Sequence, residues 1–280
     1  MIIMEEKLFD ENVPWTAEKL DALEQLVGFL FEGNPQKLMY SQTILEKLAN
    51  GSNFWLQADQ VISSAKSGNT IFFALNALDK GIKSKWDLLD LQSKEKIKSF
   101  IAGVISEWAV KQSQREIKKL LSQANSILVE IVKKEINASW PTAISDILRS
   151  SYANPEILAN NLIILKMLGL DIFNFSKLKF TSKERILFKE KLNAEMQSAY
   201  EIFYLVAKTR KENPQQISAA LMRSMFETLE VYLPWFPKEA LYLSDFFGVV
   251  IAPFLTDKKF VLGCFRCLVQ TFKREHLDFS

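Results

Sequence analysis

The stretch QREIKKLLSQANSILVEIVKKEI, residues 114–136, decides the class of fold. Its apolar residues recur every three or four positions, which places them on one side of an α-helix, while Lys118, Lys119 and Lys133 fall elsewhere. The apolar stripe consists of Ile117, Leu120, Leu121, Ala124, Ile127, Leu128 and Ile131. A helix cannot cover such a stripe by itself, so the stretch predicts a fold in which helices pack against helices.

The rest of the chain repeats this organisation. Apolar spacing, read together with breakers such as Gly33-Asn34-Pro35 and Ser67-Gly68, predicts twelve helices in six pairs. Pro141 and Pro155 each suit a first helical position, where no amide donor is missed. The predicted pairs are 17–31 with 35–48, 53–66 with 69–83, 93–111 with 114–136, 141–151 with 155–173, 183–211 with 214–232, and 238–256 with 259–275.

The spacing of the pairs indicates a helical repeat. Their first helices begin about 36 to 55 residues apart, around the 40–47-residue period of HEAT and armadillo repeats. Only 9 Gly and 8 Pro occur in 280 residues, which favours long helices over many short strands. We therefore expect an all-α fold, an α-α superhelix (a HEAT/ARM-like solenoid) of about six antiparallel helical pairs. The last pair shows no polar cap, so we expect the natural chain to continue beyond Ser280.

Composition excludes several classes of protein. The 35 Lys and Arg nearly balance the 33 Asp and Glu, so there is no excess of positive charge for direct nucleic-acid binding. The most apolar windows, Leu162–Leu170 and Phe246–Leu255, are too short to span a bilayer, and the N-terminus lacks a secretory signal. We expect a soluble intracellular protein without membrane insertion. Cys264 and Cys267 form no disulfide framework, and as i and i+3 on one helical face they are expected to be structural.

Groups for catalysis are missing from the sequence. It contains no phosphate-binding glycine loop, no dinucleotide-binding turn and no nucleophile elbow. Its single histidine, His276, gives no basis for a Ser-His or Cys-His couple. We therefore expect no enzyme: no catalytic residue, no metal site and no cofactor. The usual function of a helical repeat protein without catalytic groups is to hold a partner on its curved surface.

Several runs of sequence resemble one family. The strongest are NTIFFALNAL at 69–78, IKSKW at 82–86, NSILVEIVKKE at 125–135 and SWPTAISDI at 139–147. With weaker matches between Leu20 and about Phe272, they are similar to the N-terminal portion of exportin one, the receptor for leucine-rich nuclear export signals in the importin-beta (karyopherin) superfamily. Generic HEAT proteins share the periodicity but not the WPTAISDI run, so the resemblance is to this family rather than to karyopherins in general.

The resemblance implies an organisation and a set of partners. Residues 17–111 would form an importin-beta-like N-terminal domain at the Ran-binding end, and 112–280 would form exportin-type HEAT repeats. The chain would bind Ran-GTP on its concave face during nuclear export, and would shuttle between nucleus and cytoplasm through the nuclear pore. Phe-Gly nucleoporins would bind in grooves near residues such as Phe100 and Trp108. The repeats that form the cargo groove in the family lie outside this chain, so cargo proteins with export signals would bind through those.

The resemblance also indicates which helices face Ran. In the family, Ran lies against the second helices of the first few pairs, which here are 35–48, 69–83, 114–136 and 155–173. The exposed candidates for Ran binding on these helices are Gln42, Asn69, Phe73, Asn76, Lys80, Asn125, Lys133, Asn161 and Lys166.

Several of these candidates have a structural alternative. Asn69 precedes an apolar run and could cap its helix, and Asn161 could hydrogen-bond to neighbouring backbone. Phe72 and Phe73 are adjacent, and as core residues both would be mostly buried. Lysines such as Lys80 and Lys166 could simply be solvated.

Two other functions stay open from the sequence. A helical scaffold or adaptor unrelated to transport would show no preference for the nucleotide state of Ran. An import receptor of the importin type would release its cargo when Ran-GTP binds. Physical features of this part of the chain do not separate export from import, and only the resemblance favours export.

Overall fold

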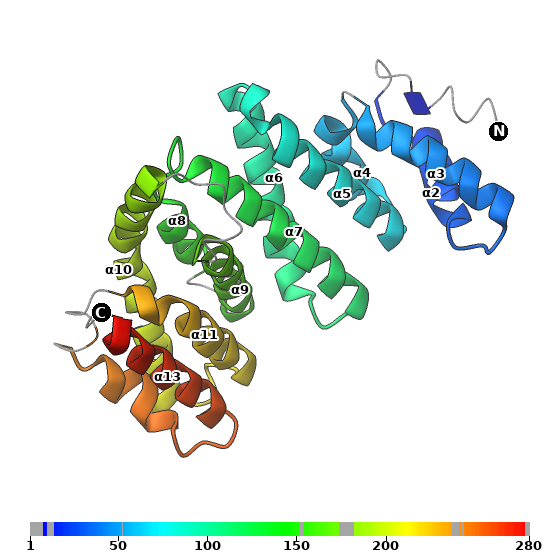
Figure 1. Cartoon of the computed structure of the whole chain (residues 1–280). Coiled ribbons are helices and arrows are strands. Elements are labelled where there is room, and N and C mark those ends of the chain that lie inside the picture. Colours follow the sequence, from blue (N-terminus) through cyan, green and yellow to red (C-terminus); the bar gives the residue numbers. More distant parts are fainter. Residues whose placement is uncertain are drawn as a thin grey trace. The chain divides into compact units, whose positions relative to one another are not determined.

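A computed structural model describes residues 8–9, 14–51, 53–151, 154–173, 182–236, 241 and 244–277 of the chain. Within these residues the regular structure is entirely helical, and successive helices run antiparallel in pairs (Figure 1). The predicted all-α fold of antiparallel helical pairs is confirmed. The chain divides into two compact units, Met1–Ile131 and Val132–Ser280, and the division falls near the end of a single helix, α7 (Arg115–Glu135).

The first unit stacks short helical pairs. Helix α2 packs against both α3 and α5, and α4 packs against α5, so that α5 is covered from two sides. Most of its core consists of Leu, Ile, Val and Ala side chains on these inward faces. In chain order its elements before α7 are α2 (Ala17–Phe29), α3 (Pro35–Asn50), the 3-10 turn η1 (Phe54–Gln57), α4 (Ala58–Ser64), α5 (Gly68–Lys85), the 3-10 turn η2 (Trp86–Leu88) and α6 (Leu91–Val110).

Capping side chains determine where these helices begin. Thr16 accepts a hydrogen bond from an amide of the first turn of α2, Asn34 accepts two at α3, and Asp90 accepts one of 2.7 Å at α6. Each cap satisfies an amide that has no partner within the helix. Gly33, with φ of 73°, makes the left-handed turn that lets α3 reverse direction after α2.

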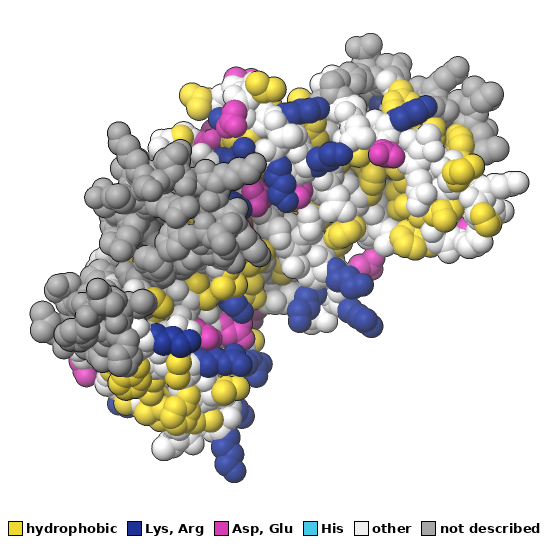
Figure 2. All heavy atoms as spheres, viewed as in Figure 1, with side chains coloured by type: hydrophobic (Ala, Val, Ile, Leu, Met, Phe, Trp, Pro, Cys, Tyr) yellow, Lys and Arg dark blue, Asp and Glu magenta, His cyan; other side chains and the backbone are white. Residues whose placement is uncertain are grey.

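The second unit places its second helices side by side. Helix α11 packs against α9 on one side and α13 on the other, while α10 packs against α8. Hydrophobic side chains gather on the exposed face of α13 (Figure 2). The elements after α7 are α8 (Ala143–Arg149), α9 (Pro155–Phe173), α10 (Ser182–Glu212), α11 (Ala219–Tyr232), the 3-10 turn η3 (Leu233–Trp235), the π-helix η4 (Phe247–Ile251), the 3-10 turn η5 (Ala252–Phe254) and α13 (Val261–Leu277).

Two buried hydroxyls fix α11 against α9. The Tyr232 hydroxyl donates to the Leu165 carbonyl oxygen at 2.8 Å, and the Thr228 hydroxyl lies 2.7 Å from the Leu162 carbonyl oxygen. Gly169 lies directly under Tyr232, where a methyl group would be 3.0 Å from the ring. The two helices therefore approach closely, and their register is set by polar as well as apolar contacts.

One predicted helix, 238–256, is wrong in its described part. Residues 247–251 form the π-helix η4 and residues 252–254 form the 3-10 turn η5 instead of a continuous α-helix. Pro253 explains the change, because it has no amide hydrogen and its ring clashes with the carbonyl four residues earlier in an α-helix. Residues 238–240 and 242–243 lie outside the described part of the chain.

Candidate functional site

Four of the predicted Ran-binding residues are exposed, and all lie on second helices of the first unit. Gln42 is on α3, and Asn69, Asn76 and Lys80 are on α5. The spacing of the three α5 residues puts them on one face of the helix. Asn69 lies inside the first turn of α5, whose N-cap is Ser67, so the interpretation of Asn69 as the cap is wrong.

Phe73 belongs to the same face of α5 but is half-buried. Its ring packs on that of Phe54 in η1, with the ring centroids 5.6 Å apart. Its neighbour Phe72 is 41% exposed, so the alternative in which both aromatics are mostly buried is wrong for Phe72. Sequence adjacency on a helix turns the two rings about 100° apart, which lets one pack while the other faces solvent.

The candidate lysines join neighbouring second helices. Lys80 of α5 donates to the side-chain oxygen of Asn50 at the end of α3. In the second unit, Lys133 of α7 pairs with Asp171 of α9 at 2.9 Å, and Lys166 of α9 pairs with Glu227 of α11 at 2.7 Å. The two ion pairs are partly exposed, so each contributes at most about 1 kcal/mol. Lys80 is exposed and Lys166 is partly exposed, so the alternative in which these lysines are solvated agrees with the structure.

Two candidates expected to be exposed are buried. Asn125 and Asn161 are 3% and 4% exposed. Asn125 falls within the buried side of α7, one position after Ala124 and three before Leu128. The Asn161 side-chain amide donates to the Ile147 carbonyl oxygen at 2.7 Å and to a serine hydroxyl in the turn after α8. The prediction of exposure is wrong for both, and the alternative that Asn161 bonds to neighbouring backbone is confirmed.

The two cysteines are buried and have little reactivity. The Cys264 thiol lies 3.7 Å from the Ile251 carbonyl oxygen, and the Cys267 thiol lies 3.6 Å from the Phe226 carbonyl oxygen. Burial raises the pKa of Cys264 to about 11 and raises that of Cys267 further. Both thiols are therefore protonated near neutral pH, which suits the structural role expected from their place on one helical face.

The described residues hold no group of three or more His, Cys, Asp or Glu side chains arranged to bind a metal ion. Among the helices that the structure describes, none combines the length and the apolar character needed to cross a membrane. The polar candidates at the surface are amides and a lysine on α3 and α5 in the first unit, and lysines on α7 and α9 in the second unit. Such an arrangement can contact another macromolecule through hydrogen bonds and charge.

Comparison with known proteins identifies the family. Residues 118–268 match the family of exportin 1-like proteins, and residues 41–107 match the importin-beta N-terminal domain. The chain belongs to the exportin 1-like family. The predicted resemblance to exportin one and the predicted HEAT-like helical repeats are thereby confirmed. This is a family of transport receptors rather than enzymes.

Curated relatives from distant organisms agree with this assignment. Exportin-1 of Dictyostelium discoideum is 30% identical over 250 residues, which cover 87% of this chain and 23% of the relative. Exportin-1 of Drosophila melanogaster is 29% identical, covering 90% of this chain and 23% of the relative. Protein EXPORTIN 1B of Arabidopsis thaliana is also 29% identical, covering 88% and 22%. This exportin 1-like chain thus spans less than a quarter of the length of these relatives.

Sequence reasoning missed which partner each surface side chain would have. The partner of Lys133 lies 38 residues away in the chain, and that of Lys166 lies 61 residues away. It also missed a cavity that brings Phe31 and Phe72 close to Arg115 and Lys119. No pattern in the sequence indicates either feature, because the predicted helix 17–31 includes Phe31, which the structure places in the turn after α2.

Proposed function

We propose that this chain is the Ran-GTP-binding part of a nuclear export receptor. The observation that carries the proposal is the pair of family matches, an importin-beta N-terminal domain at 41–107 followed by exportin 1-like sequence at 118–268. We assign Ran binding to an N-terminal domain at 17–111 and treat 112–280 as exportin-type HEAT repeats. The exportin 1-like match favours export over an import receptor or a scaffold.

The proposed contact surface is the exposed face of α5 together with α3. Asn69, Asn76 and Lys80 offer hydrogen-bond donors along α5, and Gln42 adds an amide on α3. A GTPase orders its two switch segments only when γ-phosphate and Mg²⁺ are bound. A rigid helical face with fixed donors fits one ordered surface and gains less from a mobile one, which is the physical basis for selecting the GTP form.

Further candidates differ in what they offer to Ran. In the second unit, the partly exposed Lys133 on α7 and Lys166 on α9 offer positive charge, and in the first unit the half-buried Phe73 offers an apolar ring on α5. The buried Asn125 and Asn161 act indirectly in this proposal, by holding the helices that carry the surface.

Export requires that Ran-GTP and cargo strengthen each other's binding. Linkage makes the two effects equal, so the factor by which Ran-GTP tightens cargo binding is the factor by which cargo tightens Ran-GTP binding. We propose that the leucine-rich export signal binds repeats outside this chain, and that hydrolysis of GTP on Ran releases both partners. The receptor itself catalyses nothing in this scheme.

The proposal extends to passage through the nuclear pore. Phe-Gly nucleoporins would contact Phe100, which lines a shallow cavity with Leu56 and Ile97. Trp108 is only 8% exposed and supports α6 from within. The receptor would then move between nucleus and cytoplasm.

The decisive experiment compares the nucleotide states of Ran. The full chain is immobilised, and Ran loaded with a non-hydrolysable GTP analogue or with GDP is passed over it in biolayer interferometry. We expect weak binding of the GTP form and still weaker binding of the GDP form. Equal binding of the two forms, as an unrelated scaffold would show, contradicts the proposal.

Substitutions on α5 test whether Ran-GTP binds the proposed contact surface. Replacing both Asn76→Glu and Lys80→Glu on α5 is expected to weaken Ran-GTP binding by about tenfold, because the donors are lost and negative charge is added. The matched control is Gln92→Glu, an exposed amide on the first helix α6. A loss in the control as large as that in the α5 variant would move the contact away from the second helices.

A further inference from the structure

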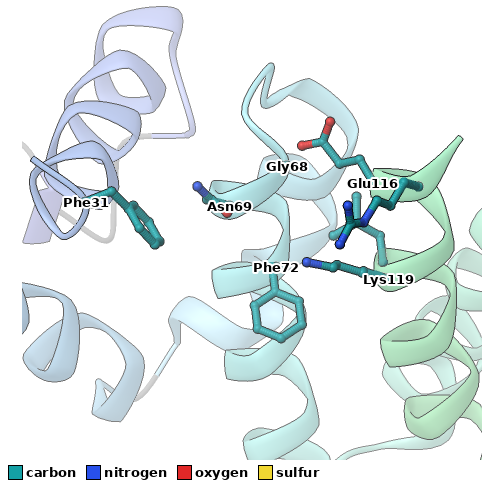
Figure 3. A pocket seen from close by; sticks show the side chains of 8 residues that line it. Phe31, Gly68, Asn69, Phe72, Glu116 and Lys119 are labelled. Carbon is teal, nitrogen blue, oxygen red and sulfur yellow. The ribbon is translucent and has the colours of Figure 1, made fainter.

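A cavity in the first unit is lined by both aromatic and charged side chains. Its volume is about 510 Å³, within the range of sites that hold a ligand or a peptide side chain. Phe31 projects into it from the turn after α2, Phe72 from α5, and Lys119 from α7 (Figure 3). The buried side chain of Leu120 completes the apolar part. The cavity is therefore an apolar slot with two aromatic sides.

Both aromatic rings are exposed although they are large. Phe31 is 67% exposed and Phe72 is 41% exposed. In the part of the chain that the structure describes, neither ring stacks on another aromatic ring. An exposed phenyl ring that lines a cavity can cover an incoming apolar side chain and remove its surface from water, which is a favourable change.

Two cations lie at the same cavity without partners. Among the described residues, Arg115 and Lys119 form no ion pair. The one carboxylate in the lining, Glu116, lies against Gly68 in the first turn of α5, where a methyl group would overlap it. The N-terminal end of a helix carries partial positive charge that favours a carboxylate. Glu116 thus lies beside the N-terminal end of α5, and the two cations can pair with a ligand.

This combination suits a peptide better than a nucleic acid. Two cations could pair with two carboxylates, whereas nucleic-acid binding proteins usually neutralise several phosphates in a row. The Glu116 carboxylate can accept a hydrogen bond from a peptide amide. The side chain of Asn69 adds both a donor and an acceptor for peptide backbone.

We propose that this cavity docks an acidic peptide segment of a partner protein, which inserts one aromatic side chain between Phe31 and Phe72. Carboxylates on either side of the aromatic residue pair with Arg115 and Lys119. The site shares Asn69 with the proposed GTPase contact, but its aromatic rings and its two cations are not part of that contact, so the proposal does not rest on Ran binding. It gives the first unit a second way to hold a protein partner.

The test uses a synthetic probe and the full chain. A fluorescein-labelled peptide, Gly-Ser-Asp-Glu-Phe-Asp-Glu-Ser-Gly, is titrated in a fluorescence anisotropy assay at low salt. We expect saturable binding that weakens by about tenfold or more when the central Phe of the peptide is replaced by Ala, which is the effect of losing one buried ring. Replacing its acidic residues by Asn and Gln is expected to weaken binding to a similar degree.

Variants of the chain test whether the peptide binds in the cavity. Lys119→Glu is expected to weaken peptide binding about tenfold at low salt, and the difference from wild type should shrink as salt is added. Lys118→Glu is the matched control, since Lys118 is the adjacent exposed lysine on α7 but does not line the cavity. For the apolar wall, Phe72→Ala should weaken binding, while Phe265→Ala, an exposed Phe on α13, should not.

The proposal is overturned by any of three results. These are equal losses in Lys118→Glu and Lys119→Glu, no loss in Phe72→Ala, or binding of a labelled oligouridylate as tight as that of the peptide. Circular dichroism of each variant confirms that the helices are retained. Ran capture is measured on the same variants, so failure here with intact Ran-GTP binding removes the peptide site alone.

Discussion

At the scale of single residues, a buried asparagine holds two neighbouring helices together through hydrogen bonds. Asn161 spans from α9 to the end of α8, where it satisfies the Ile147 carbonyl oxygen at 2.7 Å. A carbonyl near a helix C-terminus lacks a backbone partner within its own helix, and here side chains supply the donors. The amide shares this acceptor with the Ser150 hydroxyl, and it is not available to a partner protein.

Removing this amide should therefore destabilise the fold. We expect Asn161→Ala to lower the free energy of unfolding by about 0.5–1.5 kcal/mol, since one buried hydrogen bond is lost while the Ile147 carbonyl keeps its bond from the Ser150 hydroxyl. The control is Asn76→Ala on the exposed face of α5, which should change stability by less than about 0.5 kcal/mol. Urea unfolding followed by circular dichroism measures both, and equal effects would contradict the assigned role.

The buried thiols lead to a prediction about reactivity and pH. We expect Cys264 and Cys267 to react slowly with iodoacetamide at pH 8 and rapidly once the chain is unfolded, because burial raises the pKa of each thiol above its ordinary value of 9. The same raised pKa makes the stability of the folded state depend on pH. Above pH 9 the unfolded chain releases protons that the folded chain retains, so the folded state loses stability as pH rises toward 11. Mass spectrometry measures the extent of labelling. Fast labelling of the native chain would contradict the burial of the two thiols.

At the scale of elements, two helical glycines differ in how closely their surroundings are packed. Gly81 lies in α5 under the indole ring of Trp55 from η1, and a methyl group there would overlap the ring. Gly103 lies in α6 with nothing within 4 Å of the same position. Both interrupt helices, where glycine costs about 1 kcal/mol relative to alanine.

The two Gly→Ala substitutions should therefore have opposite signs. Gly103→Ala is expected to stabilise the protein by up to about 1 kcal/mol through helix propensity alone. In Gly81→Ala the same gain is outweighed by overpacking, which costs about 1–3 kcal/mol or more when a ring must move. Thermal unfolding of the two variants provides the comparison. Stabilisation by Gly81→Ala would show that α5 and η1 are less closely packed than the structure has them.

The elements that sequence predicted well are those with a strong apolar period. Helix α7 and helix α9 begin and end within one residue of the predicted ranges, because their apolar positions and flanking caps agree. The region 247–254 was predicted poorly since its residues are apolar nearly throughout, which gives no period to read. There Pro253 and local packing chose a π-helix and a 3-10 turn.

At the scale of the whole molecule, the exposed face of α13 departs from a polar surface. Leu262, Phe265, Val269 and Phe272 recur every three or four residues and are 48–63% exposed. Contiguous apolar surface of this kind binds hydrophobic dyes and favours association, whereas single exposed leucines are ordinary.

We expect the double substitution Phe265→Ser and Phe272→Ser to reduce dye fluorescence and light scattering of the purified chain. The melting temperature should hardly change, because these side chains contribute little to the core. Leu88→Ser is the control, since Leu88 is 83% exposed as a single residue outside that face. Unchanged dye binding in the double variant would show that the α13 face is not the hydrophobic surface of the molecule.

The sequence by itself determined that this protein is all helical, that its helices come in pairs, and that it resembles exportin one. These properties depend on local periodicity and on runs such as WPTAISDI at 140–147, which can be read without knowing any contact. Only the tertiary structure decided which polar residues are available. Asn125 and Asn161 were buried by helices that a one-dimensional pattern does not place beside them. Likewise, Phe31, Phe72 and Lys119 became neighbours only when three helical pairs were packed together. Exposure and proximity depend on packing between segments far apart in the chain, and helical period alone does not specify that packing.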